Sequence, residues 1–321
     1  MNKITRAACL ALLACASAGA LAAWPNDKPI EVVVGFSPGG GTDLMARKLL
    51  PFVQKRLGGN VQFVVVNKPG ASGDLAAGYV AKARPDGYTL AVVNVPSFLY
   101  LPMSRKTQYQ VQDFQLISRV VDDPTVMIAR ADGTLKSLQT VVGVSRQRPG
   151  SVSVGFNGDG TNGDLAIALL QAAAKIQLNP VAYKGTGPQK IDVLGGHLQL
   201  GMVSAGEIPE LHKNGTASII AITQFSAKRS PALPNVPTAA EAGYKVLMSS
   251  ERGFAAPHGT DAAIVARMDK AIAESLKDPQ FIATASADAP VLSYLSGTQW
   301  QKSLEQNARV LKQIADTRPK Q

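Results

Sequence analysis

The chain reads IEVVVGFSPGGGTDLMARKLLPFVQKRL from residue 30 to residue 57. The β-branched start of this stretch, residues 30–36, predicts a strand, and residues 43–57 predict a helix. The glycine-rich loop FSPGGGTD joins the two. A helix start leaves several backbone N–H groups without partners at the positive end of the helix dipole, and glycine lets an anion approach them closely. We therefore expect this loop to hold a carboxylate or a phosphate.

Three more glycine-rich loops occur in the same context: NKPGASGD at 67–74, NGDGTNGD at 157–164 and YKGTGP at 183–188. β-Rich runs at 61–66, 89–95, 125–129, 152–156, 198–203 and 218–223 alternate with helical stretches at 74–83, 164–176 and 189–194. This alternation predicts a parallel, doubly wound α/β architecture. Ligands of such sheets bind beyond the C-terminal ends of the strands, where all four loops fall. We expect one binding crevice there.

The loops at 36–43, 67–74 and 157–164 share a pattern at their ends, where each is closed by an Asp-Leu pair. A small polar residue stands one or two positions before the aspartate. Thr42, Ser72 and Asn162 are expected to cap the helices. The aspartates that follow favour the positive helix ends; they are Asp43, Asp74 and Asp164. Helix capping is the main interpretation of these aspartates, and direct ligand contact is the alternative.

Residues 1–23 have the features of a cleaved secretory signal peptide. Lys3 and Arg6 precede an apolar run over 7–18, and Ala20-Leu21-Ala22 gives the small-x-small cleavage pattern. The run is shorter than the roughly 20 residues that a membrane-spanning helix needs. A lipoprotein signal at Cys15 is a weaker alternative, because the apolar stretch before it is very short. We expect the mature protein to begin near residue 24 and to work in the periplasm.

The composition narrows the kind of ligand. Both cysteines, Cys9 and Cys15, lie in the leader, so the mature chain has no thiol for a disulfide, a metal site or a nucleophile. The formal net charge of the full chain is +10, which suits an anionic ligand. The lysines and arginines are scattered and have no interleaved aromatic residues, as nucleic-acid surfaces require. We expect a small anion as the ligand, and no nucleic acid, metal or cofactor.

Six strings along the chain carry a family resemblance. They are FSPGGGTD at 36–43, NKPGASG at 67–73, PDGYTL at 85–90, YKG at 183–185 with LGGH at 194–197, VPTAAEAGY at 236–244 and GFAAP at 253–257. In this order the chain resembles the Bug family, the TctC-like periplasmic solute-binding receptors of tripartite tricarboxylate transporters. Each string alone is weak, but six in order are specific and cover nearly the whole mature chain.

The resemblance implies two doubly wound α/β lobes of periplasmic-binding-protein type with a ligand cleft between them. Lobe 1 would take residues 24–123 and 250–321, and lobe 2 residues 124–249. Helices at 261–276 and 298–314 would pack back on lobe 1. Such receptors close around a small carboxylate and deliver it to a membrane permease, although some members of such families serve a sensor kinase instead. We expect a monomer.

The expected ligand contacts come from loops of both lobes, largely through backbone groups and bridging waters. Those of lobe 1 are Ser37, Pro38, Gly39, Gly40, Thr42, Asp43, Gly70, Ala71, Ser72, Gly73, Asn94 and Ser97. Those of lobe 2 are Asn157, Thr161, Asn162, Tyr183, Lys184, Gly185 and Ser204. For Lys184, pairing with a ligand carboxylate and simple solvation are both open.

One departure from the family pattern bears on the ligand. Members often read Met-Phe-Asp after the strand that follows the Gly-Gly turn, whereas this chain has Met202-Val203-Ser204. An acidic group there would contact a ligand amine, so Ser204 disfavours an amino acid; Glu207 is the candidate substitute. We expect a plain mono- or dicarboxylate or an aromatic carboxylate.

The motifs of the common enzyme classes are incomplete or missing in this sequence. Residues 158–163 form a literal G-x-G-x-x-G, but the next strand does not end in the acidic residue that a dinucleotide site expects. The chain has no G-x-S-x-G, H-E-x-x-H or Walker A string. The main expectation is a binding protein without catalytic residues, and the alternative is a secreted α/β enzyme acting on a small anionic substrate.

Overall fold

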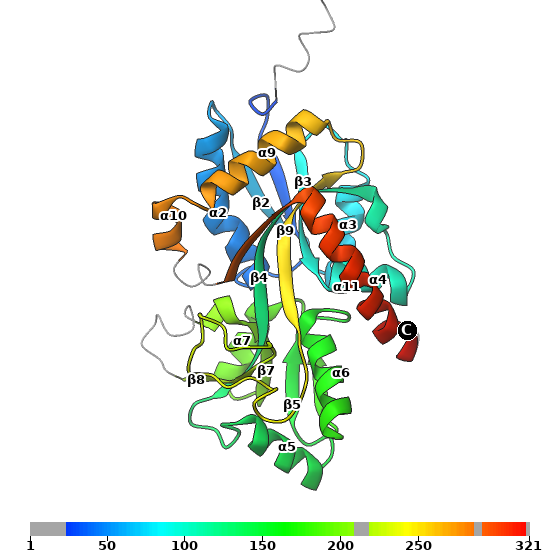
Figure 1. The fold of residues 1–321 in the computed structure, drawn as a ribbon, viewed down its shortest axis with the longest axis vertical. Coiled ribbons are helices and arrows are strands. Elements are labelled where there is room, and N and C mark those ends of the chain that lie inside the picture. The colour runs from blue at the N-terminus through cyan, green and yellow to red at the C-terminus, as the bar shows by residue number, and fades with distance from the viewer. Residues whose placement is uncertain (1–23, 209–217, 286–290, 319–321) are drawn as a thin grey trace, which may run out of the picture.

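The computed structural model describes residues 24–208, 218–285 and 291–318. The expected signal peptide, residues 1–23, lies outside the described residues. Among the helices in these ranges, none combines the length and the apolar character needed to cross a bilayer. Figure 1 shows two parts stacked along the longest axis of the molecule.

The upper part, called the first half below, contains three parallel strands at one end of the sheet. These strands are β2 (Phe63–Asn67), β1 (Ile30–Val34) and β3 (Thr89–Val95), in that spatial order. Its helices are α2 (Gly41–Leu57), α3 (Asp74–Ala81), α4 (Ser97–Ser104), α9 (Ala262–Ser275), α10 (Pro279–Thr284) and α11 (Gly297–Thr317). Short 3-10 turns η1 (Ala71–Gly73) and η2 (Val111–Asp113) and the strand β10 (Leu292–Ser296) complete it.

Both faces of this part of the sheet are covered, as alternation along a strand requires. Val32 and Val34 of β1 pack into one cluster with Leu49 of α2 and Met268 of α9. Val33, which points the other way, packs into a second cluster; its members include Val80 of α3, Phe98 of α4 and Trp300 of α11. The expected doubly wound arrangement is confirmed here.

The lower part, called the second half, repeats the scheme. Its sheet contains β7 (Leu200–Ser204), β5 (Ser153–Phe156) and β6 (Asn179–Ala182), with β5 parallel to both neighbours, and β8 (Ile219–Gln224). Its helices are α5 (Leu138–Gln147), α6 (Asn162–Ala174) and α7 (Thr186–Leu194), with the 3-10 turn η3 (Ala205–Glu207). A separate apolar cluster fills it, formed by residues such as Met127, Leu170 and Phe225.

Two long neighbouring strands join the halves (Figure 1). They are β4 (Phe114–Arg130) and β9 (Ser249–Pro257), which run antiparallel and pair Asp122 with Glu251 and Asp123 with Ser250. The sheet is therefore mixed: the expected parallel pairing occurs within each half, and it is wrong at the centre, where the joining strands run antiparallel to their neighbours. The division into lobes at residues 123/124 and 249/250 stays a prediction, and it falls where these two strands pair.

Candidate functional site

Each of the four glycine-rich loops connects a strand to a helix, as the sequence predicts. Two of them follow β1 and β2 in the first half, and two follow β5 and β6 in the second half. The loops touch across the gap between the halves. The Ser37 N–H donates to the Lys184 carbonyl oxygen over 3.0 Å, and a Cβ on Gly158 would lie 2.6 Å from Ser72 Oγ. The two halves are thus in contact around a site that both build.

Two cavities lie among these loops. The outer one, about 200 Å³, is lined by Gly35, Phe36, Gly70, Ala71, Ser72, Asn157, Gly158, Asp159, Ala182, Tyr183 and Lys184. The inner one, about 20 Å³, is lined by Phe36, Gly40, Gly41, Thr42, Asn94, Asn157, Asn162, Gly185, Thr186, Ser204, Glu207, Ser250 and Arg252. Phe36 and Asn157 belong to both, so the two cavities adjoin. This pair of cavities is the candidate site.

The start of α2 and the guanidinium of Arg252 both border the inner cavity. Gly41 and Thr42 begin α2, so their N–H groups have no partner within the helix. The Arg252 side chain is fully buried, and its Nη2 donates to Asp123 Oδ2 over 2.8 Å. A Cβ on Gly41 would lie only 2.7 Å from Arg252 Nη1. Glycine at position 41 therefore lets the helix start and the guanidinium meet.

A buried polar network closes the other side of the inner cavity. Glu207 Oε2 accepts from Lys190 Nζ at 3.0 Å and from Thr186 Oγ1 at 2.6 Å. Its Oε1 accepts from the Ser204 N–H. Lys190 also donates to the carbonyl oxygen of Gly39 in the first half. Burial opposes ionisation of Glu207, but the charges of Lys190 and Arg252 and these hydrogen bonds outweigh it, so the pKa of Glu207 lies below its ordinary value.

Two buried side-chain acceptors line the same space. Asn94 donates through Nδ2 to Thr42 Oγ1 and Ser250 Oγ, which ties three segments together. Within the described residues, Asn94 Oδ1 and Asn157 Oδ1 are buried and have no hydrogen-bond partner. Because buried polar groups are nearly always satisfied, these two amides are ready to bind a polar ligand or water.

Most of the predicted contact residues border a cavity. Seven line the inner cavity: Gly40, Thr42, Asn94, Asn157, Asn162, Gly185 and Ser204. Five others line the outer cavity: Gly70, Ala71, Ser72, Tyr183 and Lys184. Gly73 and Ser97 line an adjacent space of about 30 Å³. The predicted residues that line none of these cavities are Ser37, Pro38, Gly39, Asp43 and Thr161.

The aspartates that follow the loops have local partners. Asp43 accepts from the Gly39 N–H, from Arg47 and from Asn67. Asp164 accepts from the Gly160 N–H. Asp43 and Asp164 therefore brace the loops before their own helices, whereas Asp74 accepts from the Gln108 N–H, outside its loop.

The expectation that Thr42, Ser72 and Asn162 are N-caps is wrong. The cap positions are Gly40, Gly73 and Thr161. The two glycines have no side chain that could cap, and the Thr161 side chain makes no capping bond. Asn162 instead donates to Thr125 Oγ1 on β4. In two of the three loops, a loop N–H donates to the aspartate that follows: Gly39 to Asp43 and Gly160 to Asp164.

The side chains of Tyr183 and Lys184 differ in their surroundings. The Tyr183 hydroxyl donates to Asp192 Oδ2 over 2.6 Å. Partial burial, together with this bond and the charge of Asp192, raises the pKa of Tyr183 to about 12. The hydroxyl proton of Tyr183 is therefore used by Asp192 of α7, and the side chain faces the outer cavity mainly with its ring. Lys184 is exposed.

Sequence reasoning did not identify Arg252, Thr186 or Lys190 as site residues. Arg252 lies in a strand that the sequence does not reveal, and the other two lie on the first turns of α7. A signal for Thr186 and Lys190 was their spacing of four residues from within the loop 183–188 onward, which puts both on one face of the helix that begins there.

Two larger cavities lie away from the glycine loops. One, about 470 Å³, lies behind the joining strands and is lined by residues such as Asp122, Ser249 and Glu251. Ser250 and Arg252 alternate with these residues along β9 and line the inner cavity instead. The other, about 600 Å³, is an open groove lined by residues of α9 and α11, including Asp269 and Gln301.

Comparison with known proteins gives a consistent result. The profile of the TctC family, described as the tripartite tricarboxylate transporter family receptor, matches residues 45–315. Protein BugT of Bordetella pertussis is 34% identical over 273 residues, which are 83% of this chain and 82% of BugT.

Solved structures share the fold. The periplasmic binding protein BugD has a TM-score of 0.82 at 28% identity, over 90% of this chain and 96% of BugD. The R. palustris protein Rpa4515, solved with adipate, has a TM-score of 0.84 at 27% identity, over 92% of this chain and 98% of that protein.

Proposed function

Because the chain belongs to the tripartite tricarboxylate transporter receptor family, a family of solute-binding receptors, we propose that it binds a small carboxylate between its two halves. The protein would be exported to the periplasm through cleavage of its signal peptide near residue 23. It would act there as a monomer and deliver the acid to a membrane permease; a sensor kinase is the alternative partner. Its relative Rpa4515 was solved with adipate, which supports a carboxylate as the ligand.

The convergence of the loops on adjoining cavities is the observation that carries this proposal. The start of α2 and the guanidinium of Arg252 meet at Gly41 on the wall of the inner cavity. The charge of Arg252 is balanced by Asp123, and that of Lys190 by Glu207. Attraction of an anion therefore falls mainly to the backbone N–H groups, the helix dipole and the exposed Lys184.

The polar network also bears on the class of acid. A ligand amine needs an acidic oxygen that has not already accepted its hydrogen bonds. Ser204 supplies none, and both oxygens of Glu207 already accept from the protein. We therefore favour a plain mono- or dicarboxylate or an aromatic carboxylate over an amino acid.

The proposed cycle is capture, closure and delivery. The acid would first meet the loops of the first half, and groups of the second half would then stabilise the closed form. A ligand shifts such an equilibrium only by its differential contact with the two states. Contacts such as that between Lys190 and Gly39 cross between the halves, so they belong to the closed form.

Native mass spectrometry of the purified protein, followed by a thermal-shift screen, tests this function. The screen would contain adipate, shorter dicarboxylates, aromatic acids and acidic amino acids. We expect a retained acid, or a rise in melting temperature with a plain or aromatic carboxylate, because ligand binding to the folded state raises apparent stability. Turnover of an acid without tight binding would instead favour a secreted enzyme, and a response to acidic amino acids alone would refute the proposed class.

A further inference from the structure

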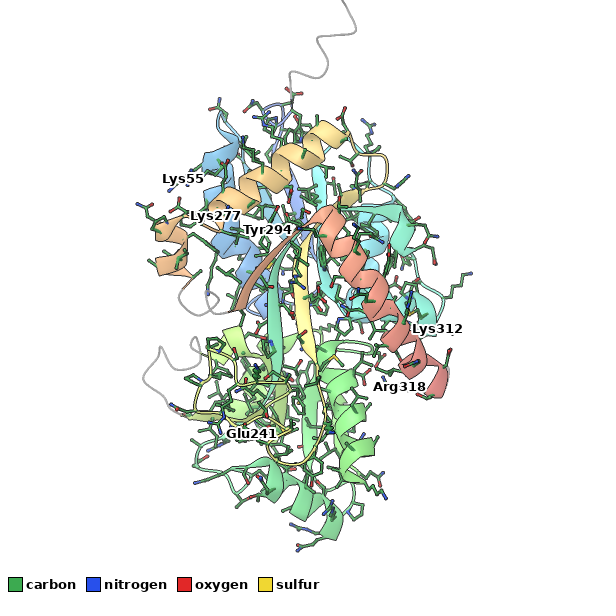
Figure 2. All side chains as sticks on the ribbon, in the orientation of Figure 1. Lys55, Glu241, Lys277, Tyr294, Lys312 and Arg318 are labelled. Carbon is green, nitrogen blue, oxygen red and sulfur yellow. The ribbon has the colours of Figure 1, made fainter. Side chains whose placement is uncertain are left out.

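The end of α11 reaches from the first half of the molecule to the second. Arg318 follows the last residue of this helix, and Figure 2 shows it at the end of α11, beside the lower part of the molecule. Its guanidinium makes a bidentate contact with Asp164 at the start of α6: Nη1 donates to Oδ2 over 2.7 Å and Nη2 to Oδ1 over 2.8 Å. Two parallel bonds to one carboxylate form the strongest geometry available to an arginine.

The surroundings of this contact tie it to the candidate site. Asp164 Oδ2 also accepts from the Gly160 N–H over 2.8 Å, so the arginine contacts the loop 157–160 through this carboxylate. Asn157, Gly158 and Asp159 of that loop line the outer cavity. The Arg318 guanidinium also lies 6.0 Å from the centre of the Tyr100 ring on α4.

Apolar packing occurs at the same place. A Cβ on Gly160 would lie 2.4 Å from the Tyr100 ring, so the loop rests directly on α4. Leu165 of α6 is completely buried in the cluster of the first half that contains Tyr100 and Leu311. Separation of the halves at this edge would break the ion pair and expose Leu165 to water.

We propose that Arg318 and Asp164 form a latch that holds the loop 157–160 against the first half and thereby sets the affinity for the ligand. This inference rests on the proposed binding function and adds a positioning residue outside the cavities. When only the closed state binds tightly, the apparent dissociation constant rises as the closed population falls. The Arg318 side chain is 29% exposed and that of Asp164 is 11% exposed, so we expect loss of the pair to reduce the ratio of closed to open molecules about three- to tenfold.

The first test measures closure without any ligand. The only cysteines, Cys9 and Cys15, lie in the expected leader, so introduced cysteines can be labelled selectively. Lys82, directly after α3, and Ala173, in α6, are both exposed. The variants Lys82→Cys and Ala173→Cys therefore provide one spin-label site in each half. Double electron–electron resonance spectroscopy would give the distribution of distances between the two spin labels. We expect Arg318→Gln to move population from a short to a longer distance. Lys312→Gln is the matched control, because it removes an exposed pair with Asp316 within α11.

The second test asks whether Arg318 acts through Asp164. Asp164→Asn keeps an acceptor for the Gly160 N–H but removes the charge, and the double variant with Arg318→Gln should be little worse than either single variant. Arg318→Lys should restore part of the short-distance population. In calorimetry with adipate, Arg318→Gln should raise the dissociation constant by up to about tenfold, in proportion to the fall in the closed fraction.

The outcomes separate the latch from the binding function. If adipate fails to bind even the wild type, the distance measurement alone decides on the latch. If the distance distributions of Arg318→Gln and Lys312→Gln are the same as that of wild type, the latch is refuted even when the wild type binds carboxylates. Additive effects of Arg318→Gln and Asp164→Asn would also refute it, since they would show that the two residues act separately.

Discussion

Replacement of Lys190 by methionine tests how the buried network beside the inner cavity is held. Lys190 Nζ lies 3.0 Å from Glu207 Oε2, and the two side chains are only 10% and 3% exposed. Two unit charges at that separation attract each other by about 5–6 kcal/mol at an effective dielectric constant of about 20. Lys190→Met removes this attraction and leaves Glu207 buried without its main counter-charge. We expect the free energy of unfolding to fall by about 3–5 kcal/mol, the usual cost of breaking a buried pair.

The matched control is the double variant Lys190→Met/Glu207→Gln. Glutamine keeps an oxygen that can accept from Thr186 or from the Ser204 N–H, but it carries no charge. We expect this variant to recover most of the stability that the single variant loses, since replacing a buried pair by neutral groups is often close to neutral. Urea unfolding followed by circular dichroism measures all three proteins. A loss below about 1 kcal/mol for Lys190→Met, or a double variant no better than the single one, would refute the reasoning.

The pH dependence gives an independent check on the same pair. In the wild type the folded-state pKa of Glu207 is lowered from 4.5, so its ionised form stabilises the fold above that pH, and the contribution is lost as the pH falls through the folded value. In Lys190→Met burial acts without the lysine, and the folded pKa should rise instead. The stability difference between the two proteins should therefore shrink as the pH falls from the raised pKa of Glu207 in the variant to its lowered pKa in the wild type. A difference in unfolding free energy that stays constant with pH would show that the loss of stability does not come from the ionisation of Glu207.

Three further substitutions test the site. Gly40→Val should leave the fold intact but raise the dissociation constant for a bound acid at least tenfold in calorimetry, because its Cβ would lie 3.0 Å from Thr186 Oγ1 across the cleft; unchanged affinity would exclude Gly40 from the site. Ser204→Asp should weaken the thermal shift given by dicarboxylates, since it adds a carboxylate beside Glu207, and an unchanged ligand profile would contradict this. Gly158→Ala should lower the free energy of unfolding by about 1–3 kcal/mol, because the residue has a φ of +104° and its Cβ would lie 2.6 Å from Ser72 Oγ; wild-type stability would show that the loop relaxes freely.

The glycine-rich loops and the strands and helices beside them could be predicted because their signals are local. A β-branched run, a glycine turn and an alanine-rich helix lie within about 30 residues of one another. The same reasoning found only residues 125–129 of β4, which runs from Phe114 to Arg130. A strand that passes through both halves changes its neighbours along its length. Its hydrophobic pattern therefore follows no single face, and the sequence shows only its most apolar segment.

The strand β9 was missed for a related reason. Its sequence SSERGFAAP contains two charged residues and a glycine, which are typical of an exposed turn. Both charges are nevertheless buried, because each has a partner far away in the chain. Arg119, Trp300 and Asn307 donate to Glu251, and Arg252 donates to Asp123. Two of these four bonds, Arg119 to Glu251 and Arg252 to Asp123, join residues more than 100 positions apart. Such pairing cannot be read from a local pattern.

Alternation along β9 places contacts to the inner cavity and to the C-terminal helix α11 on neighbouring residues of one strand. Arg252 points into the inner cavity, whereas Glu251 points to the opposite face, where it accepts from Trp300 and Asn307 of α11. The neighbouring residues of one joining strand thus hold a wall of the cavity and the anchor of α11. The end of that helix then reaches Asp164, whose carboxylate braces the loop that lines the outer cavity. The wall of the inner cavity and the anchor of α11 are therefore neighbouring residues of β9. This is the route by which the proposed latch at Arg318 would act on affinity.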